Sequence, residues 1–298
     1  MTQHPFDWQS FKRNINLIDF AKSEGYEVEK KKSTIHSVCL SHRNGDKIIV
    51  SKKNGIWVYF SVFDDSDNGT IIDFIQHKIQ KSYTEIFNFL RNWKGFSGKN
   101  NYELEDTPPH DQIRIQRVFH KCILLRNHEY LNQRGLNKEL LNSERFKGSI
   151  FRDRFDNVVF PHCKERKISA LELKNSEIHV FVKGSEKTFW QSNRLENDDH
   201  LYIAETPIDA LSYQALFSLK DAFYIATSGS PSKNQILSIL KIINDFDKVT
   251  FIGDNDEGGD KLFNRLKKAI QENGMKSIIK RHSPEQYGYD WNDVLVNS

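Results

Sequence analysis

Four carboxylates stand where two apolar runs give way to helix-forming sequence. Glu205 and Asp209 lie in the run LYIAETPIDALSY, and Asp254 and Asp256 lie in the run FIGDNDEGGDKL. Each run begins with the composition of a buried strand, and an open α/β sheet keeps its active site at the carboxyl ends of its strands. We therefore expect the four acids to face one crevice.

Such a cluster is unfavourable without a cation. Like charges about 4 Å apart cost on the order of 4 kcal/mol per pair at an intermediate dielectric constant. Mg²⁺ or Mn²⁺ would remove this repulsion, with Glu205, Asp254 and Asp256 as the predicted ligands, and would suit phosphoryl transfer. Gly258 and Gly259 follow directly and would let the backbone approach a phosphate at a helix start. The alternative is that the acids only cap helices.

Other motifs that use acids or glycines do not fit the spacing. Counted from Asp254, an EF-hand needs an acid or Asn at the fifth position and Glu at the twelfth, where the chain has Gly258 and Arg265. The sequence also contains neither the G-x-x-x-x-G-K-[ST] nor the G-x-G-x-x-G pattern. A calcium loop, a P-loop ATPase and a dinucleotide site are therefore excluded.

The elements that must position the acids are four short apolar runs, LYIAE, FYIAT, KVTFIG and SIIK, separated by helix-forming sequence. This alternation predicts an α/β fold with a parallel sheet and helices on both faces. Because the crossover connections of such a sheet share one hand, the strands would all end at one edge.

The stretch before this sheet is slightly basic and would form an α+β subdomain. Residues 111–135 predict a basic amphipathic helix that ends at Gly135. Ahead of it, residues 95–110 are polar, contain two prolines and read as a linker. We expect domains at 1–94, 111–199 and 200–298.

The first 94 residues predict a small α+β unit. Short strands are expected around HSVCL, KIIVS and IWVYFSVF, followed by a helical stretch over residues 70–93. Cys39 and His42 have the Cys-x-x-His spacing of half a zinc site, which needs two further ligands. The partner hairpin contains neither Cys nor His, so we do not expect zinc.

Glu205 with Asp209 after one strand, and Asp254-Asn255-Asp256 with glycines after another, resemble the Toprim domain. DnaG-type primases, topoisomerases, OLD-family nucleases and recombination mediators share this domain, and DWNDVL near the C-terminus is similar to a motif of Toprim proteins in phage and plasmid replication. The resemblance implies a Toprim-type parallel sheet, a catalytic role for the four acids and Mg²⁺-dependent chemistry on nucleic acid.

The preceding half resembles the N-terminal part of the DnaG primase core. YLNQRG, a Gly-containing strand, an FP hairpin and the loop KGSEKT occur in the same order there and in primase-like proteins of plasmids and mobile elements. The resemblance implies basic residues that guide single-stranded template toward the metal, without reading its sequence. The expected residues are Arg134, Lys183, Lys187, Arg152, Arg154 and Lys164.

The first unit resembles the CHC2-type zinc ribbon of the same primases. In this chain Phe60, Ser61, Phe63 and Asp64 stand where the second ligand pair would be, so the ribbon is degenerate and must be held by packing. A helicase-binding domain would follow in cellular primases. None follows the Toprim stretch here, which puts docking to a replicative helicase in doubt.

These features together predict a metal-dependent DNA primase. It would make short RNA primers from NTPs on single-stranded DNA for a plasmid, phage or conjugative element, with a possible helicase or mobilisation partner. A Toprim nuclease would use the same acids with water as the nucleophile. A non-catalytic single-stranded-DNA-binding accessory protein would need only the basic half. Topoisomerases need a Tyr nucleophile on a further domain and OLD nucleases need a P-loop, so neither fits.

Length and composition agree with a folded protein of several small domains. The chain has 298 residues, a net charge of +3 and only three widely spaced cysteines, Cys39, Cys122 and Cys163. These cysteines predict no disulfide framework and a reducing compartment. No stretch of about 18 apolar residues and no signal peptide is evident. We therefore expect a cytoplasmic protein without membrane contact.

Overall fold

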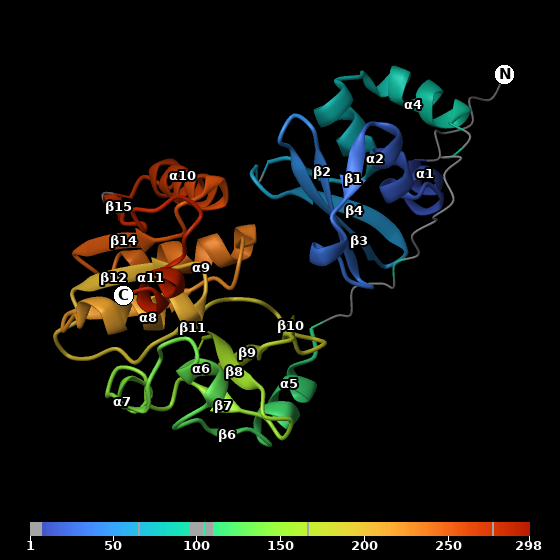
Figure 1. Ribbon diagram of the computed structural model, residues 1–298. Coiled ribbons are helices and arrows are strands. Elements are labelled where there is room, and N and C mark those ends of the chain that lie inside the picture. The colour runs from blue at the N-terminus through green and yellow to red at the C-terminus, as the bar shows by residue number, and fades with distance from the viewer. Residues whose placement is uncertain are drawn as a thin grey trace. The chain divides into compact units, whose positions relative to one another are not determined.

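The fold is known from a computed structural model, which describes residues 8–64, 66–93, 95, 104, 110–165, 167–275 and 277–298. The chain divides into two units, Met1–Pro108 and Pro109–Ser298 (Figure 1). Nearly all of the predicted linker, 95–110, lies outside the described residues. The three domain boundaries predicted from the sequence stay predictions.

The first unit is an antiparallel sheet of five strands in the order β1-β2-β3-β4-β5, with helices packed against it (Figure 1). Alternate residues of the middle strands, such as Leu40, Ile48 and Tyr59, are buried against helical residues such as Phe20 and Phe74. The three predicted strands are confirmed. The elements are α1 (Trp8–Asn14), α2 (Leu17–Ser23), β1 (Tyr26–Val28), the 3₁₀ helix η1 (Lys30–Lys32), β2 (Ser37–His42), β3 (Lys47–Lys53), β4 (Ile56–Ser61), β5 (Asn68–Gly69), α3 (Ile71–Phe74), the π-helix η2 (Ile75–Ile79) and α4 (Tyr83–Asn92).

The helical stretch predicted over residues 70–93 is interrupted. Gln80 has a φ of 58°, in the left-handed region, and ends the first segment. Ser82 then starts α4 with a capping box in which its backbone N–H donates to the Glu85 carboxylate at 2.8 Å. The prediction of one stretch was wrong in this respect because it followed the apolar spacing and overlooked a second helix-start signal.

The second unit begins with another antiparallel sheet, in the order β10-β9-β8-β7-β6. The predicted basic helix over 111–135 is wrong: α5 ends at Phe119, and residues 123–124 form an edge strand whose Ile123 is in register with Arg152. That long-range pairing overrides the local helical spacing. The elements are α5 (Gln112–Phe119), β6 (Ile123–Leu124), α6 (Glu129–Asn132), α7 (Lys138–Leu141), β7 (Phe151–Arg152), β8 (Val158–Lys164), β9 (Lys167–Lys174) and β10 (His179–Phe181).

The third sheet has the order β11-β13-β12-β14-β15 and is parallel except for β11. Side chains of β12 alternate between its two faces. Leu201 and Ile203 pack with α9 and α10, whereas Tyr202 and Ala204 pack with α8. The predicted α/β class, with helices on both faces of a parallel sheet, is therefore confirmed. The elements are β11 (Trp190–Gln191), β12 (His200–Ala204), α8 (Pro207–Phe217), β13 (Ala222–Ala226), α9 (Lys233–Ile243), β14 (Lys248–Ile252), α10 (Glu257–Glu272), β15 (Ile279–Arg281) and α11 (Trp291–Val296).

Two further sequence-based expectations bear on the environment of the chain. The three cysteines are free thiols. No helix within the described ranges is long and apolar enough to cross a membrane.

Candidate functional site

The four predicted acids, here called the acidic edge, follow two adjacent parallel strands. β12 is the central strand of the third sheet, and its last residue, Ala204, is in register with Ile252 at the end of β14. Glu205 follows β12 directly, and Asp254 lies two residues beyond β14. Asp209 is in the first turn of α8 after β12, and Asp256 caps α10 after β14, so the four acids lie at one edge of the sheet, whereas the common crevice predicted for them stays a prediction.

Two of the acids also cap helices. Asp209 is the third residue of α8, and its Oδ2 accepts hydrogen bonds from the backbone N–H of Thr206 at 3.1 Å and from its hydroxyl at 2.7 Å. Asp256 is the N-cap of α10 and accepts the Gly259 N–H at 2.7 Å. Capping therefore accounts for part of the cluster, because a carboxylate at a helix start satisfies backbone donors that would otherwise lack partners.

Capping does not account for Glu205 and Asp254. One carboxylate oxygen of each, Glu205 Oε1 and Asp254 Oδ1, is buried without a hydrogen-bond partner. Burial and the neighbouring charges raise the pKa of both carboxyls well above the usual range, and burial together with the Asp290 charge raises the pKa of Asp209. Buried acceptors without donors are costly in a folded protein. The two side chains are arranged for a positive partner that the chain does not supply.

The donor chemistry of this edge fits a hard divalent cation. No group of three or more His, Cys, Asp or Glu side chains is positioned to hold a metal anywhere in the described part of the chain, so the protein ligand set is incomplete. Mg²⁺ commonly takes only one or two carboxylates, and completes its shell with waters and substrate phosphates. The unpaired oxygens of Glu205 and Asp254 suit that mode of binding.

The loop that carries Asp254 is fixed by a glycine and an arginine. A Cβ on Gly259 would lie 2.2 Å from the Asp254 carbonyl oxygen, so a side chain there would displace the loop. Arg281 Nη2 donates to the same carbonyl at 2.8 Å, and its other terminal nitrogen contacts the Asp260 carboxylate. The absence of a side chain at Gly259 thus lets the Asp254 carbonyl lie close to the start of α10. The predicted contact of Gly258 and Gly259 with a phosphate stays a prediction.

A pocket of about 280 Å³ adjoins the acidic edge. Asp209 lines it, whereas Glu205, Asp254 and Asp256 do not. The pocket combines cationic and anionic side chains, so it can hold a ligand that carries phosphates together with a metal. Its lining residues are Tyr130, Arg134, Lys174, Asn175, Ser176, Glu177, Ile178, His179, Thr206, Ile208, Asp209 and Asp290.

Arg134, the first of the predicted nucleic-acid contacts, is held in this pocket by the C-terminal helix. Its Nη1 donates to Asn292 Oδ1 at 2.9 Å, and Asn292 Nδ2 donates back to the Arg134 carbonyl at 2.8 Å and to Ser212 Oγ at 3.1 Å. The guanidinium also lies over the Tyr130 ring, 5.0 Å from its centroid. Asn292 is buried, so the DWNDVL motif fixes the arginine of YLNQRG.

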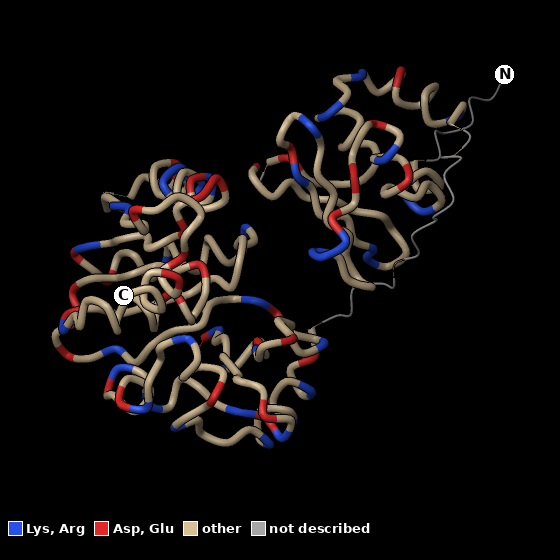
Figure 2. Tube along the Cα trace, in the orientation of Figure 1, with Lys and Arg blue, Asp and Glu red and all other residues tan. Residues whose placement is uncertain are grey.

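The other predicted basic residues are exposed and do not line the pocket. Lys164 pairs with Glu186 at 2.6 Å, and Arg152 pairs with Asp156 at 3.2 Å. Arg154 lies over Phe155 and Lys187 lies over Phe181, whereas Lys183 is simply exposed. Figure 2 shows Lys and Arg spread over both units. Their predicted contact with nucleic acid stays a prediction.

Sequence reasoning missed five residues of this region. Asp290 belongs to the DWNDVL motif, which was noted but given no site residue, and it is the N-cap of α11. Arg281 ends β15 and follows no motif. Only the strand pairing that brings β10 beside β9 places Lys174 and His179 together in the pocket. The five residues are Lys174, His179, Arg281, Asp290 and Asn292.

In the first unit, the predicted half zinc site has ordinary packing roles. Cys39 is buried in β2, and burial raises the pKa of its thiol. The ring of His42 packs 5.0 Å from that of Tyr26, and its Nδ1 accepts the Asn44 N–H at 3.3 Å. Where the ribbon resemblance places the second ligand pair, Ser61 Oγ accepts the N–H of Phe63 at 3.2 Å and closes a turn.

Comparisons with known proteins place the acidic edge in a described domain. Residues 202–295 match the family model described as Toprim-like, which confirms the Toprim resemblance, and residues 129–198 match a family of unknown function, DUF3991. No curated protein matches the sequence. Similar solved structures include the zinc-binding and RNA polymerase domains of the Aquifex aeolicus primase, with 17% identity over 97% of this chain and 84% of that chain and a TM-score of 0.42. The primase fragment of the bacteriophage T7 primase-helicase protein has 15% identity over 80% of this chain and 88% of that chain and a TM-score of 0.47.

Proposed function

Because residues 202–295 form a Toprim-like domain, we propose that this chain is a metal-dependent DnaG-like primase. It would be a nucleotidyltransferase that makes short RNA primers from NTPs on single-stranded DNA. We propose further that it primes the replication of a plasmid, phage or other mobile element. It would associate with a helicase or a mobilisation protein.

The observation that carries the proposal is the pair of buried, unpartnered carboxylate oxygens on Glu205 and Asp254. Burial and mutual repulsion raise the pKa of both groups, which means that the two carboxyls are not readily ionised together without a counter-charge that the chain lacks. Clustered acids with perturbed pKa values are a frequent mark of catalysis. Metal-assisted phosphoryl transfer is the chemistry that such a site supports best.

The chain's own residues would divide the work between the acidic edge and the pocket. A divalent cation held first by Glu205 and Asp254, with Asp256 as the third proposed ligand once substrate oxygens complete the shell, would supply charge neutralisation and Lewis acidity at phosphoryl oxygens. Asp209 would support Glu205 from the first turn of α8. Arg134 and Lys174, which line the pocket, would bind the phosphates of the nucleotide, and the fixed guanidinium of Arg134 favours bidentate contact.

The test is a primer-synthesis assay with the full chain. The protein is incubated with single-stranded DNA, labelled NTPs and either Mg²⁺ or Mn²⁺, alongside Asp254→Ala and the charge-matched control Asp245→Asn. Asp245 is exposed on the loop after α9 and pairs only loosely with Arg194, at 3.6 Å. Labelled primers from the wild type and the control, and none from Asp254→Ala, would support the proposal.

Two other outcomes would replace it. Shortened DNA that depends on Asp254 would identify a nuclease, which uses the same acids but takes water as the nucleophile. DNA binding without any product, unchanged in Asp254→Ala, would identify a non-catalytic accessory protein. A parallel reaction with dNTPs establishes which sugar the enzyme accepts.

A further inference from the structure

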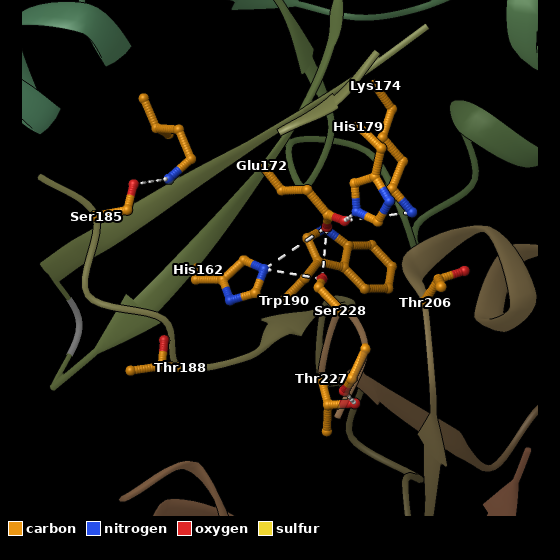
Figure 3. Close-up of polar contacts among 12 residues, drawn as sticks. His162, Glu172, Lys174, His179, Ser185, Thr188, Trp190, Thr206, Thr227 and Ser228 are labelled. Atoms are coloured by element: carbon orange, nitrogen blue, oxygen red, sulfur yellow. Dashed lines mark hydrogen bonds and ion pairs between the residues drawn. The ribbon is translucent and has the colours of Figure 1, made fainter. Parts of the chain in front are cut away.

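A buried carboxylate that the proposed mechanism does not use lies at the centre of a polar cluster (Figure 3). Glu172 lies in β9, the strand between β10 and β8 of the antiparallel sheet of the second unit, and is fully buried. Around it, in the view of Figure 3, are His162 from β8, Lys174, His179 from β10 and Ser228 from the loop after β13. We call these five residues the Glu172 cluster. A lone charge at such depth is retained only when several partners hold it.

The partners keep Glu172 ionised. Burial alone would raise its pKa, but the contacts of His162 and His179 and the charge of Lys174 hold the pKa well below the usual range. The pKa of His162 is itself lowered by burial, whereas Lys174 places its ammonium 3.2 Å from Glu172 Oε1. The carboxylate and the ammonium are therefore the permanent ion pair of the cluster.

The two oxygens of Glu172 serve different parts of the second unit. Oε1 contacts Lys174 Nζ at 3.2 Å and His179 Nε2 at 2.6 Å, and both of these residues line the pocket. Oε2 accepts the Ser228 hydroxyl at 2.5 Å. Ser228 Oγ lies 3.2 Å from His162 Nε2, which can donate to it. One carboxylate thus holds the cationic side of the pocket and a loop of the parallel sheet.

That loop contacts the backbone of the acidic edge. Thr227 N–H donates to the Ala204 carbonyl at 3.2 Å, and Gly229 N–H donates to the Glu205 carbonyl at 3.1 Å. Ser228, between them, has a φ of 57°, in the left-handed region that is unfavourable for a serine. The hydrogen bond to Glu172 is one of the contacts that hold it there.

We propose that Glu172 is a positioning residue that sets Lys174 and His179 of the pocket against Glu205 of the acidic edge. It touches no substrate itself. It acts through Lys174 and His179, which would face the phosphates of a bound nucleotide, and through the loop that would support the metal-ligating acid. The proposal rests on the proposed function only for its effect on primer synthesis, because its effect on nucleotide binding can be measured separately.

The experiment is a double-mutant cycle on nucleotide binding with the full chain. ATP is the probe, titrated in Mg²⁺ into the wild type, Glu172→Gln, Lys174→Met and the double variant. Glu144→Gln, an exposed residue with 79% side-chain exposure, is the matched control. We expect Glu172→Gln to weaken ATP binding about tenfold, because it removes the negative charge that holds Lys174 and His179 in place. In the Lys174→Met background the same change should cost only about threefold, because the part of its effect that depends on Lys174 is already lost and the loop contact remains.

Several results would overturn the proposal. One is an ATP affinity of Glu172→Gln equal to that of the wild type. Another is that Glu172→Gln weakens ATP binding by the same factor in the wild type and in Lys174→Met. The third is a wild type that binds no ATP. If Glu172→Gln does not fold, Ser228→Ala decides: it removes only the loop contact, so binding should weaken about threefold, and unchanged binding refutes the idea. In an active enzyme, Glu172→Gln should raise KM for NTP more than it lowers kcat, which a general loss of folded protein would not do. Coupled ATP binding without primer synthesis would refute the proposed function and leave the positioning role intact.

Discussion

The two units each contain a pair of buried or half-buried carboxylates, and the pairs are treated in opposite ways. In the first unit, Lys78 places its ammonium 2.5 Å from Asp46 and also contacts Asp67. In the second unit, Glu205 and Asp254 each keep a buried oxygen with no partner. One pair carries its own cation, and the other lacks one.

The difference separates structural acids from candidate catalytic ones. Burial would raise the pKa of Asp46, but hydrogen bonds and charge from Lys78 lower it below the usual range. Tyr59 also donates its hydroxyl to Asp67 at 2.6 Å, so the first pair is fully satisfied. At Asp254, burial and the Glu205 charge raise the pKa. Carboxylates in proteins are therefore better judged by their partners than by their number.

The location of Lys78 adds to this contrast. Asp46 lies in the turn between β2 and β3, where its carbonyl accepts the His42 N–H at 2.8 Å. Asp67 lies in the turn between β4 and β5, where its carbonyl accepts the Ser61 N–H at 2.8 Å. These turns follow the two strands, β2 and β4, in or just after which the ribbon resemblance placed its ligand pairs. A lysine of the chain itself joins them.

The largest expected effect comes from removing one acid of the unsatisfied pair. Asp254→Asn should reduce primer synthesis by about 1000-fold, comparable to the loss of a main electrostatic contact in a transition state. The same change should leave the unfolding temperature without metal unchanged or higher, because it removes repulsion. Mn²⁺ should raise the unfolding temperature of the wild type more than that of the variant. Activity assays and thermal unfolding with and without Mn²⁺ measure both effects, with Asp245→Asn as control.

Removing the Lys78 ammonium from the first unit should lower stability and leave the response to metal unchanged. Lys78→Met should lower the free energy of unfolding by about 3 kcal/mol, because it leaves two carboxylates without their counter-charge. Urea unfolding measures the loss, and Lys53→Met, at an exposed position in β3, is the control. Folded Lys78→Met should still respond to Mn²⁺ as the wild type does. A variant as stable as the control would show that the pair in the first unit is not satisfied by Lys78.

Local patterns in the sequence were sufficient to place the acids. Glu205 and Asp254 follow apolar runs, and the direction of parallel strands then brings them to one edge. The fold class follows from the same alternation. The patterns were less informative before residue 200. Ile123 looks like part of a helix until its partner Arg152, far along the chain, is known.

The cationic side of the pocket could not be predicted for a related reason. Glu172 is a charged residue in the interior of a strand, and strand alternation predicts which positions are buried but not which buried charge will find partners. His162, His179 and Ser228 come from three other segments. Asn292 is similar, since its contact with Arg134 spans 158 residues. Side-chain contacts between distant segments leave no local pattern.

Loosening Arg134, which lines the pocket, should have an intermediate effect. Asn292→Leu removes the acceptor for the guanidinium and should weaken ATP binding about tenfold. Asn292→Asp keeps an acceptor and adds a charge that favours Arg134, so it should bind more tightly than Asn292→Leu. Equal affinities for the two variants would mean that Asn292 only packs the helix. Titration with ATP in Mg²⁺ gives both constants.

The smallest expected effect is a difference in the sign of the pH dependence. Asp46 has a lowered pKa in the folded chain, so its contribution to stability is present above the unfolded value, near 4, and is lost as the pH falls. Asp254 has a raised pKa, to about 9, so the folded chain binds its proton more tightly and stability is lost as the pH rises from about 4 through 9.

Two substitutions in the full chain separate these contributions. Urea unfolding without metal, from pH 3 to pH 9, should show that Asp254→Asn flattens the alkaline decline by about 1 kcal/mol, since water at a half-exposed edge screens much of the repulsion. Asp46→Asn should instead flatten the acid decline. If both variants changed the same limb, the two carboxylate pairs would share one electrostatic environment, and the distinction between an internally neutralised pair and one that awaits a cation would be lost.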